Sequence, residues 1–136
     1  MKSDSKPPVV ALINSSPDVV DMIRIALEQV GIVLVSAFTH DIRDGAVDVE
    51  AFVKQHQPQI ILYDVAPPYQ ANWLLFQHIS GMPVMAGRHF ILTTTNERHV
   101  RELAAQHHLH EIVGKPYDLG LLVTAVQDMM KRVPPR

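Results

Sequence analysis

Three polar residues stand at or just after short apolar runs, and together they could act on a phosphoryl group. Asp64 follows the apolar run 59–63, Thr93 ends a second run, and Lys115 comes shortly after a third. A carboxylate can attack a phosphorus atom, a hydroxyl can donate to a phosphoryl oxygen, and an ammonium can neutralise the remaining charge. These are the residue types that acyl-phosphate chemistry needs, if the fold brings them together.

The segments around these residues alternate between two kinds of pattern. Apolar runs such as 9–13, stopped by turn residues, suit strands buried on both faces of a parallel sheet. Ser16 and Pro17 suit a helix N-cap and first helical position, and apolar residues at three-to-four spacing follow them. The expected strands are residues 9–13, 32–38, 59–64, 90–93 and 111–113, and the expected helices are residues 17–30, 47–56, 72–79, 97–106 and 118–130.

Strands that alternate with helices through five cycles predict an α/β fold. The class is a doubly wound, five-stranded parallel sheet with helices on both faces. The length of 136 residues, with 47% hydrophobic and 19% charged residues, suits one globular domain. We expect this domain to span residues 9–132, between flexible tails at 1–8 and 133–136. Chemistry in such a sheet gathers at the carboxyl ends of the strands, where the three polar residues are expected.

Composition excludes several classes of function. The net charge of -2 argues against nucleic-acid binding by this domain. The absence of cysteine excludes disulfides, thiolate metal sites and cysteine nucleophiles. No stretch approaches the roughly 20 apolar residues of a membrane span, and the polar start lacks a signal-peptide core. We therefore expect a cytoplasmic protein that does not contact membranes.

Three blocks of this sequence, in order, resemble those of the response-regulator receiver domain of two-component signalling. Residues 59–68 resemble the phosphorylation strand, with Pro68 four places after Asp64. Residues 90–93 resemble the fourth strand with its switch threonine, and residues 113–118 resemble the Lys-Pro-aromatic-Asp signature. The resemblance covers essentially the whole chain, and it implies the flavodoxin-like strand order 2-1-3-4-5.

The resemblance also implies a function that is not enzymatic. Asp64 would accept a phosphoryl group from a histidine kinase or phosphotransfer protein, and Thr93 and Lys115 would respond to it. Because Thr94 and Thr95 follow, the pattern leaves the switch hydroxyl open by one residue. A protein output partner, or a second copy of the chain, would bind at the fourth and fifth helices. A cis bond before Pro116 is implied as well.

The sequence departs from the family pattern where a pair of acids normally holds a divalent cation. Asn14 and Ser15 stand there, so two carboxylates are replaced by neutral groups. Mg²⁺ prefers anionic oxygens beside its waters, and losing one such charge costs several kcal/mol at an effective dielectric of about 20. Asp64 and the backbone carbonyl of Ala66 could still be ligands. We therefore expect weak Mg²⁺ binding at a degenerate site.

Ile112 and the histidine-rich segment 107–110 bear on two further possibilities, a ring-flip switch and a zinc site. Ile112 stands where the family often has an aromatic residue, so a ring-flip switch is not available. The histidine-rich segment 107–110 suggests zinc, but neighbouring side chains in a loop need not converge, and a solvated loop is the better interpretation.

Two alternatives to a phosphorylated receiver remain. A degenerate receiver would bind a protein or dimerise without phosphorylation, which Asn14 and Ser15 favour. A flavodoxin-like enzyme would need a glycine-rich phosphate cradle after the first strand, and residues 14–17 contain no glycine.

Overall fold

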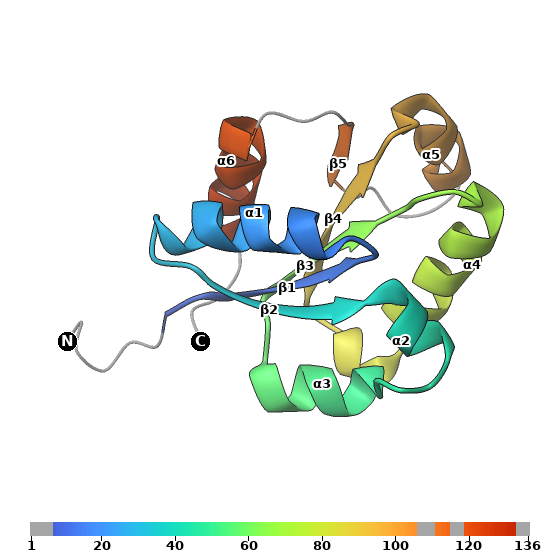
Figure 1. Ribbon diagram of the computed structural model, residues 1–136, viewed down its shortest axis with the longest axis horizontal. Helices are drawn as coiled ribbons and strands as arrows, with labels where there is room; N and C mark the ends of the chain where they lie inside the picture. Colours follow the sequence, from blue (N-terminus) through green and yellow to red (C-terminus); the bar gives the residue numbers. More distant parts are fainter. Residues whose placement is uncertain (1–6, 106–110, 115–118, 133–136) are drawn as a thin grey trace.

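The computed structural model describes residues 7–105, 111–114 and 119–132. It is an α/β structure in which strands and helices alternate along the chain (Figure 1). The strands are β1 (Val9–Asn14), β2 (Val33–Phe38), β3 (Ile60–Asp64), β4 (His89–Thr94) and β5 (Glu111–Gly114). The helices are α1 (Pro17–Glu28), α2 (Thr39–Arg43), α3 (Val49–His56), α4 (Tyr69–Ser80), α5 (Glu97–Ala104) and α6 (Leu119–Met130), with a 3₁₀ turn at Pro83–Met85.

All paired strands in the sheet are parallel, and their order is β2-β1-β3-β4-β5. The strand β5 is four residues long and lies beside β4, between two segments outside the described residues. The central strands β1 and β3 are buried along their whole length. Burial on both faces explains why they are continuous apolar runs rather than alternating patterns. The predicted α/β arrangement of a parallel sheet and helices is confirmed.

Helices cover both faces of this sheet (Figure 1). On one face, α1 and α6 pack on alternate side chains of the strands, such as Leu12 and Leu62. On the other face, α3, α4 and α5 pack on the intervening side chains, such as Ile13 and Tyr63. An aromatic cluster around Phe76 fills the centre of this second layer. Two apolar layers therefore hold the strand ends in fixed positions.

The helix prediction was wrong in two places. The short helix α2 was not predicted, because five residues are too few to show helical periodicity. The helix α4 begins at Tyr69, three residues before the predicted start, after Pro68 at its N-cap position. The predicted start of α1 is confirmed: the Ser16 hydroxyl accepts a hydrogen bond from the Val19 amide at 3.4 Å.

No described helix has both the length and the hydropathy that crossing a membrane requires.

Candidate functional site

The residues singled out by the sequence gather at the carboxyl edge of the sheet. Asp64 ends β3 and is paired in register with Thr93 on β4. On the other side, Ile13 of β1 is paired with Tyr63, so that Asn14 lies beside Asp64 one residue further on. Because the strands are parallel, their ends meet at one edge, where ligands of such sheets bind.

Asp64 and Thr93 form a buried hydrogen-bonded pair. The Thr93 hydroxyl donates to Oδ1 of Asp64 at 2.8 Å. Only 4% of Asp64 and 1% of Thr93 are exposed. The Val65 amide donates to the Thr93 carbonyl at 2.8 Å, which ties the ends of β3 and β4 together. A hydroxyl is thus fixed against the carboxylate at the end of the central strand.

The two threonines after Thr93 have other partners. The Thr94 hydroxyl donates to the Val65 carbonyl at 2.8 Å and accepts from the Asn96 amide at 3.1 Å. The Thr95 hydroxyl lies 2.8 Å from the hydroxyl of Tyr69. Of the three, Thr93 is therefore the residue hydrogen-bonded to Asp64.

Asn14 and Ser15 take very different positions. Asn14 is buried, with 1% exposed, and its Oδ1 accepts a hydrogen bond from the Ser16 amide at 2.9 Å. Its Nδ2 has no hydrogen-bond partner among the described residues. Ser15 is exposed. At this edge Asn14 therefore offers an N–H donor that no described residue accepts, and its oxygen already caps the local turn.

Two residues that the sequence did not point to complete this edge. Asn72, on α4, is buried, and its Nδ2 donates to the carbonyl of Ala66. The guanidinium of Arg43, at the end of α2, donates to Oδ1 of the same asparagine. The hydrogen bonds from Arg43 to Asn72 and from Asn72 to Ala66 therefore connect an exposed cation to the backbone two residues after Asp64. No pattern in the sequence predicted these hydrogen bonds, because Arg43 lies in the unpredicted helix and Asn72 was interpreted as an ordinary helix start.

These contacts do not fit a divalent cation. The carbonyl of Ala66 is already a hydrogen-bond acceptor for Asn72, and Asn14 presents a donor rather than a free oxygen. Mg²⁺ requires oxygen ligands in near-octahedral geometry and favours carboxylates. Across the described ranges, no group of three or more His, Cys, Asp or Glu residues could hold a metal ion. The donor set present here suits an anion better than a metal ion.

Tyr63 lies next to this site and carries a hydroxyl without a hydrogen-bond partner among the described residues. Burial raises the pKa of its phenol well above the ordinary value, the guanidinium of Arg43 opposes this rise, and the carboxylate of Asp64 adds to it. Both charges therefore lie within electrostatic reach of one phenol.

Tyr63→Phe is expected to leave the free energy of unfolding near pH 7 unchanged or to raise it slightly. The variant removes a buried polar atom that makes no hydrogen bond with the described residues, and such losses are close to neutral. Above about pH 10, the unfolded chain loses the phenolic proton and the folded chain keeps it, so stability falls as pH rises. Denaturant unfolding at neutral and alkaline pH should show a smaller alkaline loss for Tyr63→Phe than for wild type.

Tyr69→Phe is the matched control for this prediction, because Tyr69 has a hydrogen bond to lose. Its hydroxyl lies 2.8 Å from that of Thr95. Removing it should cost up to about 1.5 kcal/mol near pH 7. A loss of that size from Tyr63→Phe as well would show that the Tyr63 hydroxyl has a partner.

Several predicted residues lie outside the described residues. They are Lys115, the cis bond before Pro116, and the histidines of the segment 107–110. Ile112 lies on β5 and is paired in register with Leu92 of β4. Among the described residues, the cis peptide bond is Pro67–Pro68.

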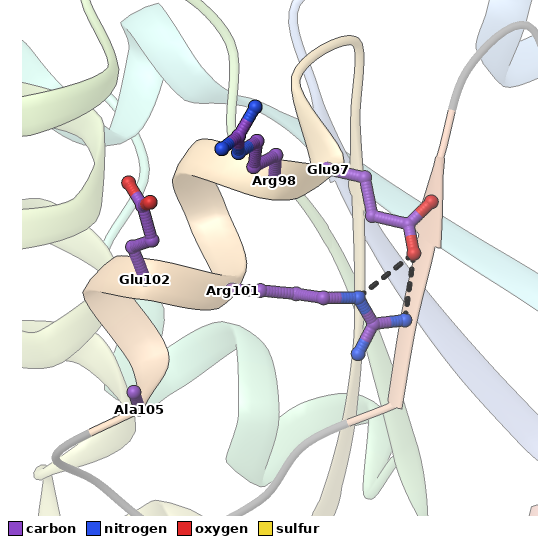
Figure 2. Close-up of a pocket in the computed structure, with 5 residues that line it drawn as sticks. All are labelled: Glu97, Arg98, Arg101, Glu102 and Ala105. Atoms are coloured by element: carbon purple, nitrogen blue, oxygen red, sulfur yellow. Dashed lines mark hydrogen bonds and ion pairs between the residues drawn. The ribbon is translucent and has the colours of Figure 1, made fainter.

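A pocket lies along α5, and Asp64 is not among the described residues that line it (Figure 2). Its volume is about 580 Å³. Charged side chains dominate its described lining, and the guanidinium of Arg101 is paired with the Glu97 carboxylate at 2.7 Å. The residues that line it are Glu97, Arg98, Arg101, Glu102 and Ala105.

The sequence matches no protein-family model and no curated protein. Solved structures, in contrast, match it over nearly its whole length. A response regulator receiver protein from Burkholderia phymatum is 21% identical, with a TM-score of 0.72 over 94% of this chain and 98% of that one. A response regulator from Thermotoga maritima is 14% identical, with a TM-score of 0.73 over 93% and 99%. A two-component response regulator from Clostridium difficile is 17% identical, with a TM-score of 0.72 over 92% and 97%. The resemblance found in the sequence is thus confirmed in the fold: this chain has the flavodoxin-like α/β fold of response-regulator receiver domains.

Proposed function

We propose that this chain is a receiver module of a two-component system, in which Asp64 accepts a phosphoryl group from a histidine kinase or phosphotransfer protein. The observation that carries the proposal is the buried Asp64–Thr93 pair, with 2.8 Å between hydroxyl and carboxylate at the carboxyl edge of the sheet. The fold shared with response regulators from several bacteria supports it. In this role the chain is a cytoplasmic signalling module and not an enzyme.

The proposed transfer involves one bond formed and one broken. A carboxylate oxygen of Asp64 attacks the phosphorus of the phosphohistidine, and the phosphorus–nitrogen bond breaks with its electron pair going to the imidazole nitrogen. The product is an acyl phosphate on Asp64. The Thr93 hydroxyl, which now donates to the carboxylate, would donate to a phosphoryl oxygen instead, and Lys115 would neutralise charge.

The signal would leave through the elements that follow Thr93. A movement of Thr93 would shift the end of β4 and the helix α5, which begins at Glu97. An output protein, or a second copy of the chain, would then bind across α5 and α6. The charged pocket lies along α5, one of these two helices (Figure 2).

The test is the intact mass of the protein after incubation with a small-molecule phosphodonor, with and without Mg²⁺. Wild type is expected to gain one phosphoryl group, and Asp64→Ala is expected to gain none. Asp128→Ala is a matched control, because it removes an exposed aspartate on α6 and should label like wild type. A wild-type chain that stays unlabelled under both conditions would contradict the proposal.

A second candidate function is a degenerate receiver that binds its partner without phosphorylation. The observation that favours it is the poor set of oxygen ligands at the edge, where Asn14 offers an N–H and the Ala66 carbonyl already accepts a hydrogen bond from Asn72. In this case Lys115 would hold Asp64 in one fixed state. Asp64→Asn should then change dimerisation or partner binding without any phosphodonor, and an unchanged sedimentation profile and partner affinity would exclude this function.

A further inference from the structure

We infer that the Arg43–Asn72 pair takes the place of a divalent cation at Asp64, so that a guanidinium, and not a metal ion, neutralises the anion bound there. This inference rests on the proposed function, because the anion is the phosphoryl group on Asp64. It assigns to Arg43 and Asn72 a role that the sequence pattern did not reveal.

Asn72 contacts the backbone two residues after Asp64. Its side chain is buried, with 5% exposed, and both ends of the amide are used. The nitrogen donates to the Ala66 carbonyl and the oxygen accepts from Arg43. A metal ion at that carbonyl would have to use the second lone pair of the oxygen, beside the positive end of an N–H donor. A metal ion that displaced the amide instead would leave a buried polar group without its partner, which costs about 1–3 kcal/mol.

Arg43 brings a positive charge to Asn72. The guanidinium reaches the site from an exposed position at the end of α2, and it keeps N–H groups beyond the one that bonds Asn72. A divalent ion beside it would be repelled, whereas a phosphoryl oxygen would be attracted. Arginine also matches phosphate geometry, because its planar fork can donate two parallel hydrogen bonds. Arg43 is therefore suited to the anion and unsuited to a neighbouring metal ion.

Asn14 brings a further N–H donor to this edge. Its Nδ2 is buried beside Asp64 and has no hydrogen-bond partner among the described residues. Buried donors are nearly always satisfied, so an orphan at a site edge points to a missing acceptor. A phosphoryl oxygen on Asp64 would supply one. Two independent groups, on β1 and on α2, thus favour an anion at the same edge.

The experiment compares the rate of phosphodonor labelling in EDTA with the rate in Mg²⁺, followed by intact mass. Wild type is expected to label at rates within about twofold of each other. Arg43→Gln keeps a donor for Asn72 but removes the charge, and it should label about tenfold more slowly, a loss of about 1.4 kcal/mol in transition-state stabilisation. Arg24→Gln is the matched control, because that arginine pairs with Asp21 on α1 and should not affect labelling.

The outcomes separate the inference from the proposed function. Labelling that needs Mg²⁺, or that is unaffected by Arg43→Gln, would overturn the inference and leave Asp64 as the acceptor. If wild type does not label at all, the proposed function fails. A titration with Mg²⁺, followed by tryptophan fluorescence, then tests whether a metal ion binds at Asp64. Trp73 follows Asn72 directly and is the only tryptophan, so its fluorescence reports on this edge. A saturable response at millimolar Mg²⁺ that is lost in Asp64→Asn would overturn the inference, and no response would support it.

Discussion

A chain that carries Asn14→Asp and Ser15→Asp together is expected to bind Mg²⁺ at least 100-fold more tightly than wild type. Each new carboxylate attracts a dication by several kcal/mol at an effective dielectric of about 20, so part of that gain is enough for about 100-fold in affinity. Asn14 lies beside Asp64, and its side chain is buried. Isothermal titration calorimetry at constant ionic strength should measure the change.

Stability gives a second measurement of the same variant. Without metal, a carboxylate at position 14 is buried beside Asp64, and like charges in a buried site repel each other. The double variant should therefore melt at a lower temperature than wild type in EDTA. Mg²⁺ at about 100 times the dissociation constant should raise the free energy of unfolding of the double variant by about 2.7 kcal/mol.

Two further variants test whether the gain arises at this edge. Adding Asn72→Ala to the double variant removes the hydrogen bond to the Ala66 carbonyl and should make Mg²⁺ binding tighter than in the double variant. Adding Asp64→Asn to the double variant should weaken it. Equal affinity in the double variant with and without Asp64 would place the bound ion elsewhere and contradict the prediction.

Phe76→Ala is expected to lower the free energy of unfolding by about 3–5 kcal/mol, the range found when a buried phenylalanine is truncated. Phe76 is 1% exposed and packs against three other aromatic rings in the layer between the sheet and α4. Its ring centroid lies 5.1 Å from that of Tyr63 and 5.3 Å from those of Trp73 and Phe90. Truncation leaves a cavity that these rigid rings cannot fill. Equilibrium denaturation in urea, followed by circular dichroism, should measure the loss.

Leu74→Ala is the matched control on the same helix. Leu74 is 57% exposed, so its truncation should change the free energy of unfolding by no more than about 0.5 kcal/mol. Because Tyr63 precedes Asp64 directly, the Phe76 cavity should also loosen the end of β3. Similar small losses from Phe76→Ala and Leu74→Ala would mean that the aromatic cluster does not hold the layer together.

Sequence patterns predicted the main elements because those elements have strong local signals. The strands β1 and β3 are buried on both faces and are therefore continuous apolar runs. The helix α1 carries its own start signal in Ser16 and Pro17, and the hydrogen bond from the Val19 amide confirms it. The helix α2 was not predicted because it is too short for a periodic pattern, and for the same reason Arg43 was not identified as a site residue.

Sequence by itself determined the α/β class and the position of Asp64 at a strand end, because local periodicity fixes elements and parallel strands place their ends at one edge. The resemblance to receiver domains also placed Asn14 and Ser15 where that family usually has a pair of acids. Only the tertiary structure decided what surrounds Asp64. The pairing with Thr93 depends on strand register. The hydrogen bond between Arg43 on α2 and Asn72 on α4 joins residues that are 29 positions apart in the sequence. Such contacts are set by how helices pack on the sheet, and no local pattern of residues encodes them.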